Sequence, residues 1–148
     1  MQAHPSTREG LENFALLVFD GLPLLIPQSD IYSLEPTVDM NLSVVHDGSV
    51  GHIEQSGNFW DLYALSADLS LLKSCPDTYH IAILLKNVQP VYGLLCEQIS
   101  TIARGEIRIY PLPTIMNTDN SPLLALALVG EEVSYISSAS ALSRLLPQ

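Results

Sequence analysis

Basic side chains are scarce in this sequence of 148 residues. Six Lys and Arg stand against sixteen Asp and Glu, which leaves a formal net charge of −10 at pH 7. The basic residues are scattered along the chain and form no cluster. Nucleic acids and anionic lipid surfaces carry the same sign of charge and would be repelled. We therefore expect no nucleic-acid partner.

Long apolar runs and frequent cysteines are also missing. The longest apolar run, residues 123–129, has seven residues, whereas a membrane-spanning helix needs about 20. Residues 1–10 contain one Arg and no apolar core of the kind found in a signal peptide. The two cysteines are Cys75 and Cys96, and Cys96 lies inside an apolar run, which favours reduced thiols over a disulfide framework. These features predict a cytoplasmic protein without membrane insertion.

Motifs for catalysis and for metal or phosphate binding are absent from the sequence too. The four histidines, at positions 4, 46, 52 and 80, belong to no Cys-x-x-Cys or His-Glu-x-x-His pattern. The eight glycines form no phosphate-binding loop, and no serine lies in a Gly-x-Ser-x-Gly turn. His46 and His52 flank an Asp-Gly pair, but a two-residue turn there would pair position 43 with 52, so the two rings would not be cross-strand partners. The sequence predicts no cofactor, no metal site and no catalytic residue.

Short apolar segments separated by proline, glycine and aspartate fill the first part of the chain, a pattern that favours strands over long helices. Phe14–Phe19 and residues 22–26 flank Asp20-Gly21. An Asp-Gly pair between two apolar runs predicts a tight β-hairpin, because both turn residues need positive φ.

A second Asp-Gly pair, Asp47-Gly48, predicts another hairpin, joining residues 42–46 to residues 49–53. Residues 55–58 then form a predicted turn before a strand over residues 59–63, and the spacing of leucines over residues 64–72 predicts a short amphipathic helix.

The second part of the chain repeats this order of strands and turns and ends in a predicted short helix over residues 138–146. Its predicted strands are Ile81–Leu85, 91–96, Ile107–Tyr110, 123–129 and 133–136. The similar endings of the two parts indicate a weak internal duplication. We therefore predict a mainly β fold within a single domain, residues 1–148. It consists of two small five-stranded β-barrel subdomains packed side by side, approximately residues 14–72 and 79–146, with a few short helices.

Three segments together resemble the CheW-like family of adaptor proteins in chemotaxis-type signalling. Residues 14–34 are similar to the first hairpin of the family and the turn that follows, with the sequence FALLVFDGLPLLIPQSDIYSL. Residues 51–57, GHIEQSG, fall where the family carries Gly-Val-Ile-Asn-Leu-Arg-Gly. Residues 91–99, VYGLLCEQI, resemble the Val-Gly-Leu-Leu-Val-Asp-Glu-Val segment of the family. The likeness extends over most of the chain, from about residue 14 to residue 146.

The resemblance implies two five-stranded barrels around a shared core and a protein without catalysis or cofactor. Such a protein bridges the helical hairpin of a chemoreceptor and the regulatory domain of a histidine kinase, with the receptor in a groove between the barrels. Positions similar to the kinase-facing set of the family are Ile31, Ser33 and Gly51. Ser56, with Gly57, stands at the place of the receptor-contacting Arg.

The chain departs from the family pattern at this last place. Asn-Leu-Arg-Gly is replaced by Glu54-Gln55-Ser56-Gly57, so a guanidinium is lost and a carboxylate is gained. A Ser hydroxyl cannot replace the five donors of Arg. Two interpretations remain open: receptor coupling is lost, or the partner has changed.

Other functions also remain open on sequence alone. A small-molecule-binding β-barrel protein or minor enzyme would need polar groups converging on a cavity, for which His80, Tyr92 and Glu97 are the candidates. A self-associating protein would use exposed strand edges beside Pro23 or Pro111.

Two features concern the way an adaptor of this kind would bind. The aromatic residues around Trp60 belong either to the core or to an interface. Such an adaptor would bind through apolar anchors such as Ile31. Because its net charge is −10, we expect the surface of its partner to be basic near the contact.

Overall fold

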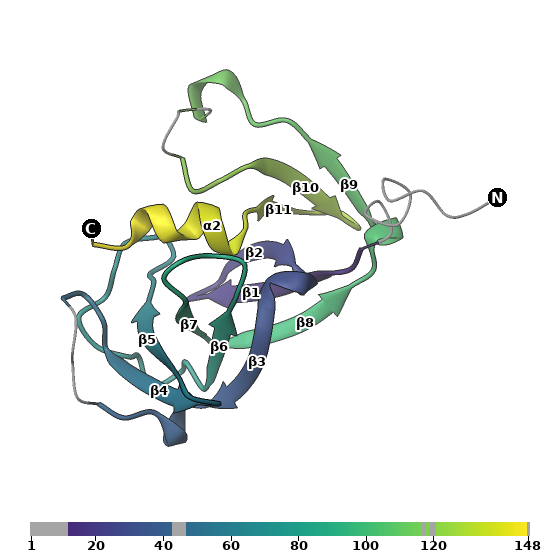
Figure 1. Cartoon of the computed structure of the whole chain (residues 1–148). Coiled ribbons are helices and arrows are strands. Elements are labelled where there is room, and N and C mark those ends of the chain that lie inside the picture. Colours follow the sequence, from purple (N-terminus) through teal and green to yellow (C-terminus); the bar gives the residue numbers. More distant parts are fainter. Residues whose placement is uncertain (1–11, 43–46, 117, 119–120, 148) are drawn as a thin grey trace.

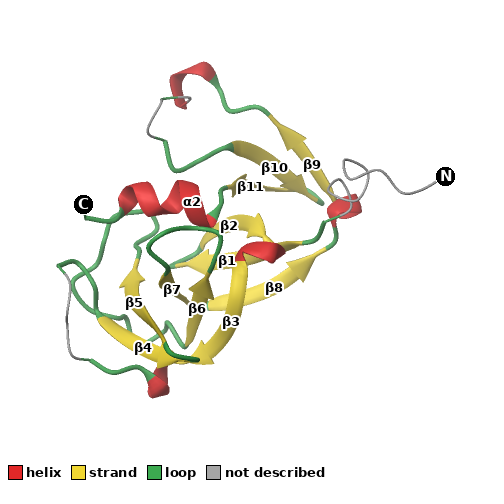
Figure 2. Ribbon diagram, viewed as in Figure 1, coloured by secondary structure: helices red, strands yellow, loops and turns green. Residues whose placement is uncertain are grey.

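A computed structural model describes residues 12–42, 47–116, 118 and 121–147, which form two curled sheets lying side by side (Figures 1 and 2). The larger sheet has six strands in the order β8-β1-β2-β11-β10-β9. Its strands are β1 (Phe14–Phe19), β2 (Leu22–Pro27), β8 (Gln98–Ile102), β9 (Ile107–Tyr110), β10 (Ala125–Val129) and β11 (Glu132–Ile136). The smaller sheet has five strands in the order β3-β6-β7-β5-β4. Its strands are β3 (Ile31–Pro36), β4 (Gly51–Gln55), β5 (Asn58–Ala64), β6 (Ile81–Leu85) and β7 (Tyr92–Cys96).

The helical segments are short. The α-helix α2 (Ala139–Leu142) is followed directly by a 3₁₀ turn, η5 (Ser143–Leu145), which confirms the predicted C-terminal helix. Ser138 caps α2, its hydroxyl accepting a hydrogen bond from the Ala141 amide at 3.0 Å. The other 3₁₀ turns are η1 (Gln28–Asp30), η2 (Thr37–Asp39), η3 (Arg104–Glu106) and η4 (Thr114–Met116). Within the described ranges, no helix has the length and hydropathy needed to cross a membrane.

Two tight turns form as their sequences predict. Asp20 and Gly21 have φ values of 50° and 88° and join β1 to β2. Ser56 and Gly57, with φ values of 53° and 78°, join β4 to β5 in the same way. Both pairs have the backbone that a two-residue hairpin turn needs, since its twist matches that of the flanking strands.

The hairpin predicted at Asp47-Gly48 does not form as expected. The first strand of this hairpin is predicted over residues 42–46, of which residues 43–46, including His46, lie outside the described residues. His52 pairs with Asn41 through an isolated bridge and with Asp61 of β5, where the turn at 47–48 would have paired it with residue 43. The two-residue turn at residues 56–57 pairs β4 with β5, so β4 has a neighbouring strand without a hairpin at Asp47-Gly48.

The helix predicted over residues 64–72 is wrong. Residue 64 ends β5, and a tight loop follows in which Leu65 and Leu71 form a β-bridge. The hydroxyl of Ser66 accepts a hydrogen bond from the Ser70 amide at 3.1 Å, and Leu69 takes a positive φ of 63°. Serine hydroxyls that bind nearby backbone groups compete with helix formation. The leucine spacing reflects a folded-back loop that reaches the core.

The two sheets confirm the mainly β fold with two curled sheets side by side, but they do not follow the predicted division into residues 14–72 and 79–146. The six-stranded sheet combines β1 and β2 with β8 to β11, and the five-stranded sheet combines β3, β4 and β5 with β6 and β7. The larger sheet also has one strand more than predicted. Local patterns mark where strands occur, whereas the pairing of distant strands depends on which faces fit together.

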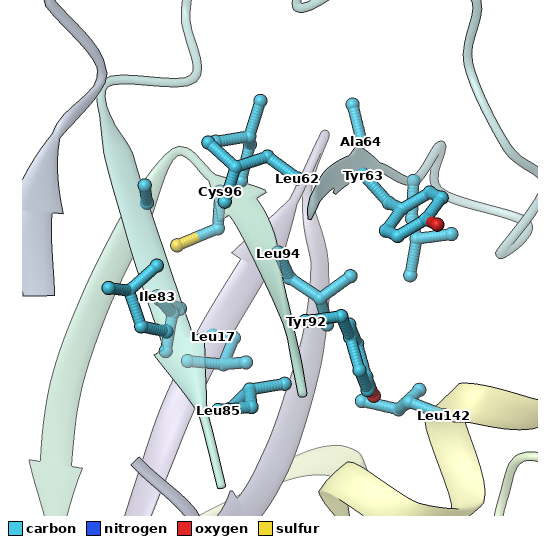
Figure 3. Packing of buried hydrophobic residues seen from close by; sticks show 14 of the residues in the cluster. Leu17, Leu62, Tyr63, Ala64, Ile83, Leu85, Tyr92, Leu94, Cys96 and Leu142 are labelled. Atoms are coloured by element: carbon cyan, nitrogen blue, oxygen red, sulfur yellow. The ribbon is translucent and has the colours of Figure 1, made fainter. Parts of the chain in front are cut away.

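The main core lies between the sheets. Figure 3 shows Leu17 of β1 gathered with Ile83 and Leu94 of the smaller sheet, and Leu142 of α2 lies next to Tyr92. Trp60 belongs to this core, because its side chain is only 2% exposed and its indole N–H donates to the Leu85 carbonyl at 3.2 Å. A second, smaller cluster lies on the other face of the six-stranded sheet and consists of buried Leu25, Ile107, Ala127 and Ile136.

A buried carboxylate fixes the position of α2. Asp30 accepts a hydrogen bond from the Ala139 amide, at the N-terminus of α2, at 2.8 Å. Its other oxygen accepts from the Asn87 side chain at 3.0 Å. The Tyr92 hydroxyl donates to the Ala139 carbonyl at 2.6 Å, which adds a second connection to the same residue. Negative charge at a helix N-terminus is stabilising, so these contacts hold α2 against η1 and β7.

Candidate functional site

Strand β3 lies at one edge of the five-stranded sheet and separates two surface hollows. The first, which we call the inter-sheet groove, has a volume of about 390 Å³ and is formed by residues of β3 and η1 and of β1 and β8 in the larger sheet. It is lined by Ala15, Gln28, Ile31, Leu34, Ile99, Ser100 and Thr101.

The inter-sheet groove is uncharged over the residues that line it. Ala15, Ile31 and Ile99 are buried or half-buried at its base, and Leu34 is 48% exposed at its edge. Exposed apolar residues gathered in a concave surface are typical of protein docking sites. The groove therefore suits the apolar side of a peptide or helix.

The second hollow, which we call the acidic hollow, has a volume of about 430 Å³ and lies between β3, η2 and β4. It is lined by Glu35, Asp39, Asn41, His52, Ile53, Glu54 and Gln55. Three of these residues are carboxylates, and none of the residues that line the hollow is Lys or Arg. A hollow lined by carboxylates would favour a basic surface on a partner, as predicted from the net charge of the chain.

The two edge strands of the smaller sheet meet beside the acidic hollow. The Ser33 hydroxyl of β3 shares its one proton between Glu35 Oε2, at 2.9 Å, and Gln55 Oε1 of β4, at 3.4 Å. The Tyr32 ring stacks on Trp60, with ring centroids 5.0 Å apart. The His52 ring stacks on Phe59 at 4.4 Å. The Ser33 and Tyr32 contacts hold β3 close to β4 and β5, so the sheet curls.

The three predicted kinase-facing residues occupy three different environments. Ile31 lies in the inter-sheet groove, whereas Ser33 lies beside the acidic hollow, on the other side of the same strand. A bulge in the β3–β6 pairing lies between these two residues. Gly51 is buried, and a Cβ atom there would lie 2.6 Å from the Asn41 carbonyl oxygen and 2.7 Å from Met40 Cγ. Gly51 therefore permits the close approach of the segment at residues 40–41.

The two predicted receptor-contacting residues, Ser56 and Gly57, are exposed at the tip of the β4–β5 turn. They do not line the inter-sheet groove. Gln55, the residue before them, is connected to Ser33 by the hydrogen bond described above. Gly51 lies at the opposite end of β4, roughly 16 Å away at about 3.3 Å per residue. The structure thus brings Ser33 close to the turn and leaves Gly51 apart from it.

The residues considered for a small-molecule site do not converge on one cavity. Tyr92 begins β7 and its hydroxyl is bound to the helix α2, as described above. Burial raises the pKa of this hydroxyl, as does the nearby Asp30 carboxylate. Glu97 lies past the other end of β7, where it accepts a hydrogen bond from the Gly21 amide at 2.9 Å, and His80 precedes Ile81 at that same end.

The cysteines are free thiols held in unreactive surroundings. Burial raises the pKa of Cys96 to about 12. Burial also raises the pKa of Cys75, and the charge of Asp77 adds to this effect. Reactive cysteines have a lowered pKa, so neither thiol has the properties of a nucleophile. The described part of the chain contains no group of three or more His, Cys, Asp or Glu residues that could hold a metal ion.

The strand edges considered for self-association differ from each other. Pro23 lies in β2, an inner strand of the larger sheet, and the β11 ladder on β2 begins only at Leu24. The missing amide of Pro23 is therefore tolerated without an edge position, which corrects the sequence interpretation. Pro111 does follow an edge strand, β9.

The sequence did not predict that Ala15, Leu34 and Ile99 would share a groove. Ile31 and Leu34 are visible as a spaced apolar pair, but their neighbour Ile99 is far away in sequence. The pairing of β8 with β1 brings it there, with Ile99 opposite Leu17. The pattern of residues within one strand does not predict which distant strand pairs with it.

Comparison with known proteins identifies the fold. No protein-family model matches the chain, and no curated protein matches it either. Among solved structures, the chain is similar to the scaffolding protein TtCheW from Thermoanaerobacter tengcongensis, with a TM-score of 0.70 and 13% sequence identity. The match covers 89% of this chain and 92% of that chain. The chain therefore has a CheW-like fold of two curled sheets.

Proposed function

We propose that this protein is a non-catalytic cytoplasmic adaptor in chemotaxis-type signal transduction, connecting the helical hairpin of a chemoreceptor to the regulatory domain of a histidine kinase. The sequence resemblance to the CheW-like family and the shared fold with a CheW scaffolding protein support this proposal. The observation that carries it is the inter-sheet groove, an uncharged concave surface between the two sheets.

The inter-sheet groove is proposed as the receptor site. A receptor helix would place apolar side chains against Ile31 and Leu34, which the structure leaves half-buried and exposed. Complete burial of a Leu side chain contributes about 1.5–3 kcal/mol, so the half-exposed Leu34 can add about 1 kcal/mol when a partner covers it. Ile31, which the resemblance assigned to the kinase side, therefore belongs with the receptor contact in this proposal.

The acidic hollow and the strands around it are proposed as the kinase site. Ser33 lies at its edge and Gly51 supports the segment that forms one of its walls. Glu35, Asp39 and Glu54 favour Lys or Arg side chains on the kinase domain. Ser56 and Gly57 lie at the nearby β4–β5 turn, where the loss of the family's Arg changes the polar contact available to a partner.

Two surface variants test the two sites separately. Leu34→Glu places a charge in the inter-sheet groove, and Glu54→Lys reverses a charge at the acidic hollow. We expect Leu34→Glu to weaken binding of a labelled receptor hairpin by at least about tenfold and to leave binding of the kinase domain unchanged. Glu54→Lys should have the opposite pattern, with a smaller effect that decreases at high salt.

Matched controls for these variants lie on other parts of the surface. Ile115, which is 88% exposed on η4, gives the control Ile115→Glu, and exposed Glu131 in the β10–β11 turn gives Glu131→Lys. Both should bind the two partners like the unmodified protein. If neither the receptor hairpin nor the kinase domain binds the unmodified protein, the adaptor function is wrong.

A further inference from the structure

The strand register places two rows of side chains on one face of β9, β10 and β11. Residues paired across neighbouring strands point to the same face of the sheet. One row is Tyr110, Leu126 and Tyr135, and the next row is Arg108, Leu128 and Val133. The opposite face carries Ile107, Ala127 and Ile136 of the second core cluster. We call the surface formed by the two rows the β9–β11 face.

The β9–β11 face is apolar where a solvated sheet face is usually polar. An antiparallel sheet with one face in water normally alternates apolar and polar residues along each strand. Here Tyr110 is 46% exposed and Val133 is 57% exposed, while Ala127 on the opposite face is only 1% exposed. In Figure 1 the β9–β10 arm extends away from the five-stranded sheet. The main core therefore reaches the first row only at Tyr135, and Tyr110 and Val133 lie beyond it.

The β9–β11 face continues into an apolar hollow. Tyr135 at the end of its first row also lines a hollow of about 200 Å³, together with Leu22, Ala67, Asp68, Leu69, Met116 and Leu123. Most of this lining is apolar, and the hollow is large enough for one Leu, Met or Phe side chain. Tyr135 also pairs with Leu24, a residue of the main core. The exposed rows, the hollow and the core thus form one continuous apolar surface.

The dimensions of this surface fit a helix. Two strand spacings of about 4.8 Å separate Tyr110 from Tyr135, a span of roughly 10 Å. This equals about two turns of an α-helix, whose pitch is about 5.4 Å. Apolar side chains at positions i, i+4 and i+7 of a helix lying across the strands would contact the first row and enter the hollow.

The charge of Arg108 and the net charge of the chain indicate whether the helix belongs to a different protein or to a second copy of this chain. Arg108 is the charged member of the two rows, and it is exposed. A carboxylate on the helix would pair with it and fix the position of the helix on the face. A second copy of this chain is disfavoured, because two molecules with a net charge of −10 repel each other.

We propose that the β9–β11 face is a docking site for an amphipathic helix of a different protein, whose apolar side covers the two rows and whose carboxylate pairs with Arg108. This surface is separate from the inter-sheet groove and the acidic hollow. It does not depend on the receptor and kinase assignments.

Synthetic helical peptides provide the probe. The test peptide carries Leu at positions i, i+4 and i+7 and a Glu placed to reach Arg108. One control peptide has Lys in place of that Glu, and another has the same composition with the leucines scrambled. Backbone amide NMR spectra of the full chain are recorded during titration with each peptide. We expect saturable shifts confined to β9, β10, β11 and the hollow with the test peptide, and none with the scrambled peptide.

Variants of the protein make the result specific. Val133→Glu should weaken binding of the test peptide by about tenfold or more, while Val38→Glu, which changes an exposed Val outside this face, should leave that binding unchanged. Arg108→Glu should reverse the preference, so that the Lys peptide binds more tightly than the Glu peptide. Leu34→Glu should leave peptide binding unchanged, which separates this site from the proposed receptor groove.

Three results would overturn the proposal. The first is the absence of shifts in β9–β11 up to the solubility limit of the test peptide. The second is equal binding to the unmodified protein and to Val133→Glu. The third is concentration-dependent dimerisation in which this face is covered by a second copy, measured by light scattering and by the same amide signals.

Discussion

Replacing Gly51 by Ala distinguishes a structural role for this residue from a direct role in partner binding. The added Cβ would lie 2.6 Å from the Asn41 carbonyl oxygen and 2.7 Å and 2.8 Å from Met40 Cγ and Sδ. These distances are shorter than ordinary van der Waals contact, so the segment at residues 40–41 has to move away from β4. That movement strains the bridge between Asn41 and His52, whose two backbone hydrogen bonds are both 2.8 Å.

The expected cost follows from these contacts. Overpacking of a well-packed site costs about 1–3 kcal/mol, and a weakened backbone hydrogen bond adds about 1 kcal/mol. We therefore expect Gly51→Ala to lower the free energy of unfolding by at least about 2 kcal/mol. For a chain of this length that corresponds to a fall in Tm of roughly 4–8 °C.

Urea and thermal unfolding followed by circular dichroism measure this effect. Gly105→Ala is the matched control, because no atom lies within 4 Å of a Cβ built there, and its unfolding should be unchanged. The double variant Met40→Ala/Gly51→Ala should lose less stability than the sum of the two single variants. The clash with the Met40 side chain is removed in the double variant, while the clash with the Asn41 oxygen remains. If Gly51→Ala is as stable as the unmodified protein and still loses binding of the kinase domain, our reasoning is refuted and Gly51 itself touches the partner.

Two further predictions concern buried polar groups. Asp30→Ala removes acceptors for the Ala139 amide and for Asn87, and should lower the free energy of unfolding by about 3 kcal/mol in urea titrations, with a smaller loss for Asp30→Asn. Burial raises the pKa of Tyr79 to about 12, and burial also raises that of Tyr92. The unfolded chain ionises its thiols near pH 8.5 and its phenols near pH 10. The free energy of unfolding should therefore begin to fall above about pH 8.5 through Cys96, whose pKa is raised to about 12. Above pH 10 each of the two phenols adds a further fall of about 1.4 kcal/mol per pH unit as pH rises toward 12. An unfolding free energy that stays constant from pH 9 to pH 12 would contradict the second prediction.

The parts of the fold that the sequence predicts are those determined by neighbouring residues. Asp20-Gly21 forms its hairpin because only a few residue types accept positive φ at both turn positions. The strand Ile81–Leu85 begins and ends at the predicted residues, since it is a short, fully apolar run flanked by polar residues.

The failed helix over residues 64–72 shows where local reasoning stops. Three leucines at helical spacing also satisfy a loop that folds back on itself, and the Ser66 hydroxyl favours the loop by binding a backbone amide that a helix would use. The assignment of strands to sheets failed for a related reason. Neither β1 nor β8 contains a local signal that they pair, although Phe14 lies opposite Ile102 in the sheet.

Some residues of the candidate site could be predicted from the sequence, but the surface that each of them faces could not. Ile31 and Ser33 are two residues apart, yet a β-bulge between them directs one to the groove and the other to the acidic hollow. Which partner each residue meets therefore depends on the exact register of β3 on β6. A resemblance between sequences aligns the residues but does not carry that register.

The exposure of the β9–β11 face could not be predicted from the sequence either. Residues 123–129 are apolar at every position, which indicates a strand covered on both faces without indicating what covers it. The register shows that the chain itself covers one face at Ala127, although Ile109 on the edge strand of that face is exposed, and leaves Val133 exposed on the other face. Since exposed apolar sheet faces are liabilities for a monomer, and repulsion between copies of an acidic chain opposes self-association, a different protein is the remaining source of cover.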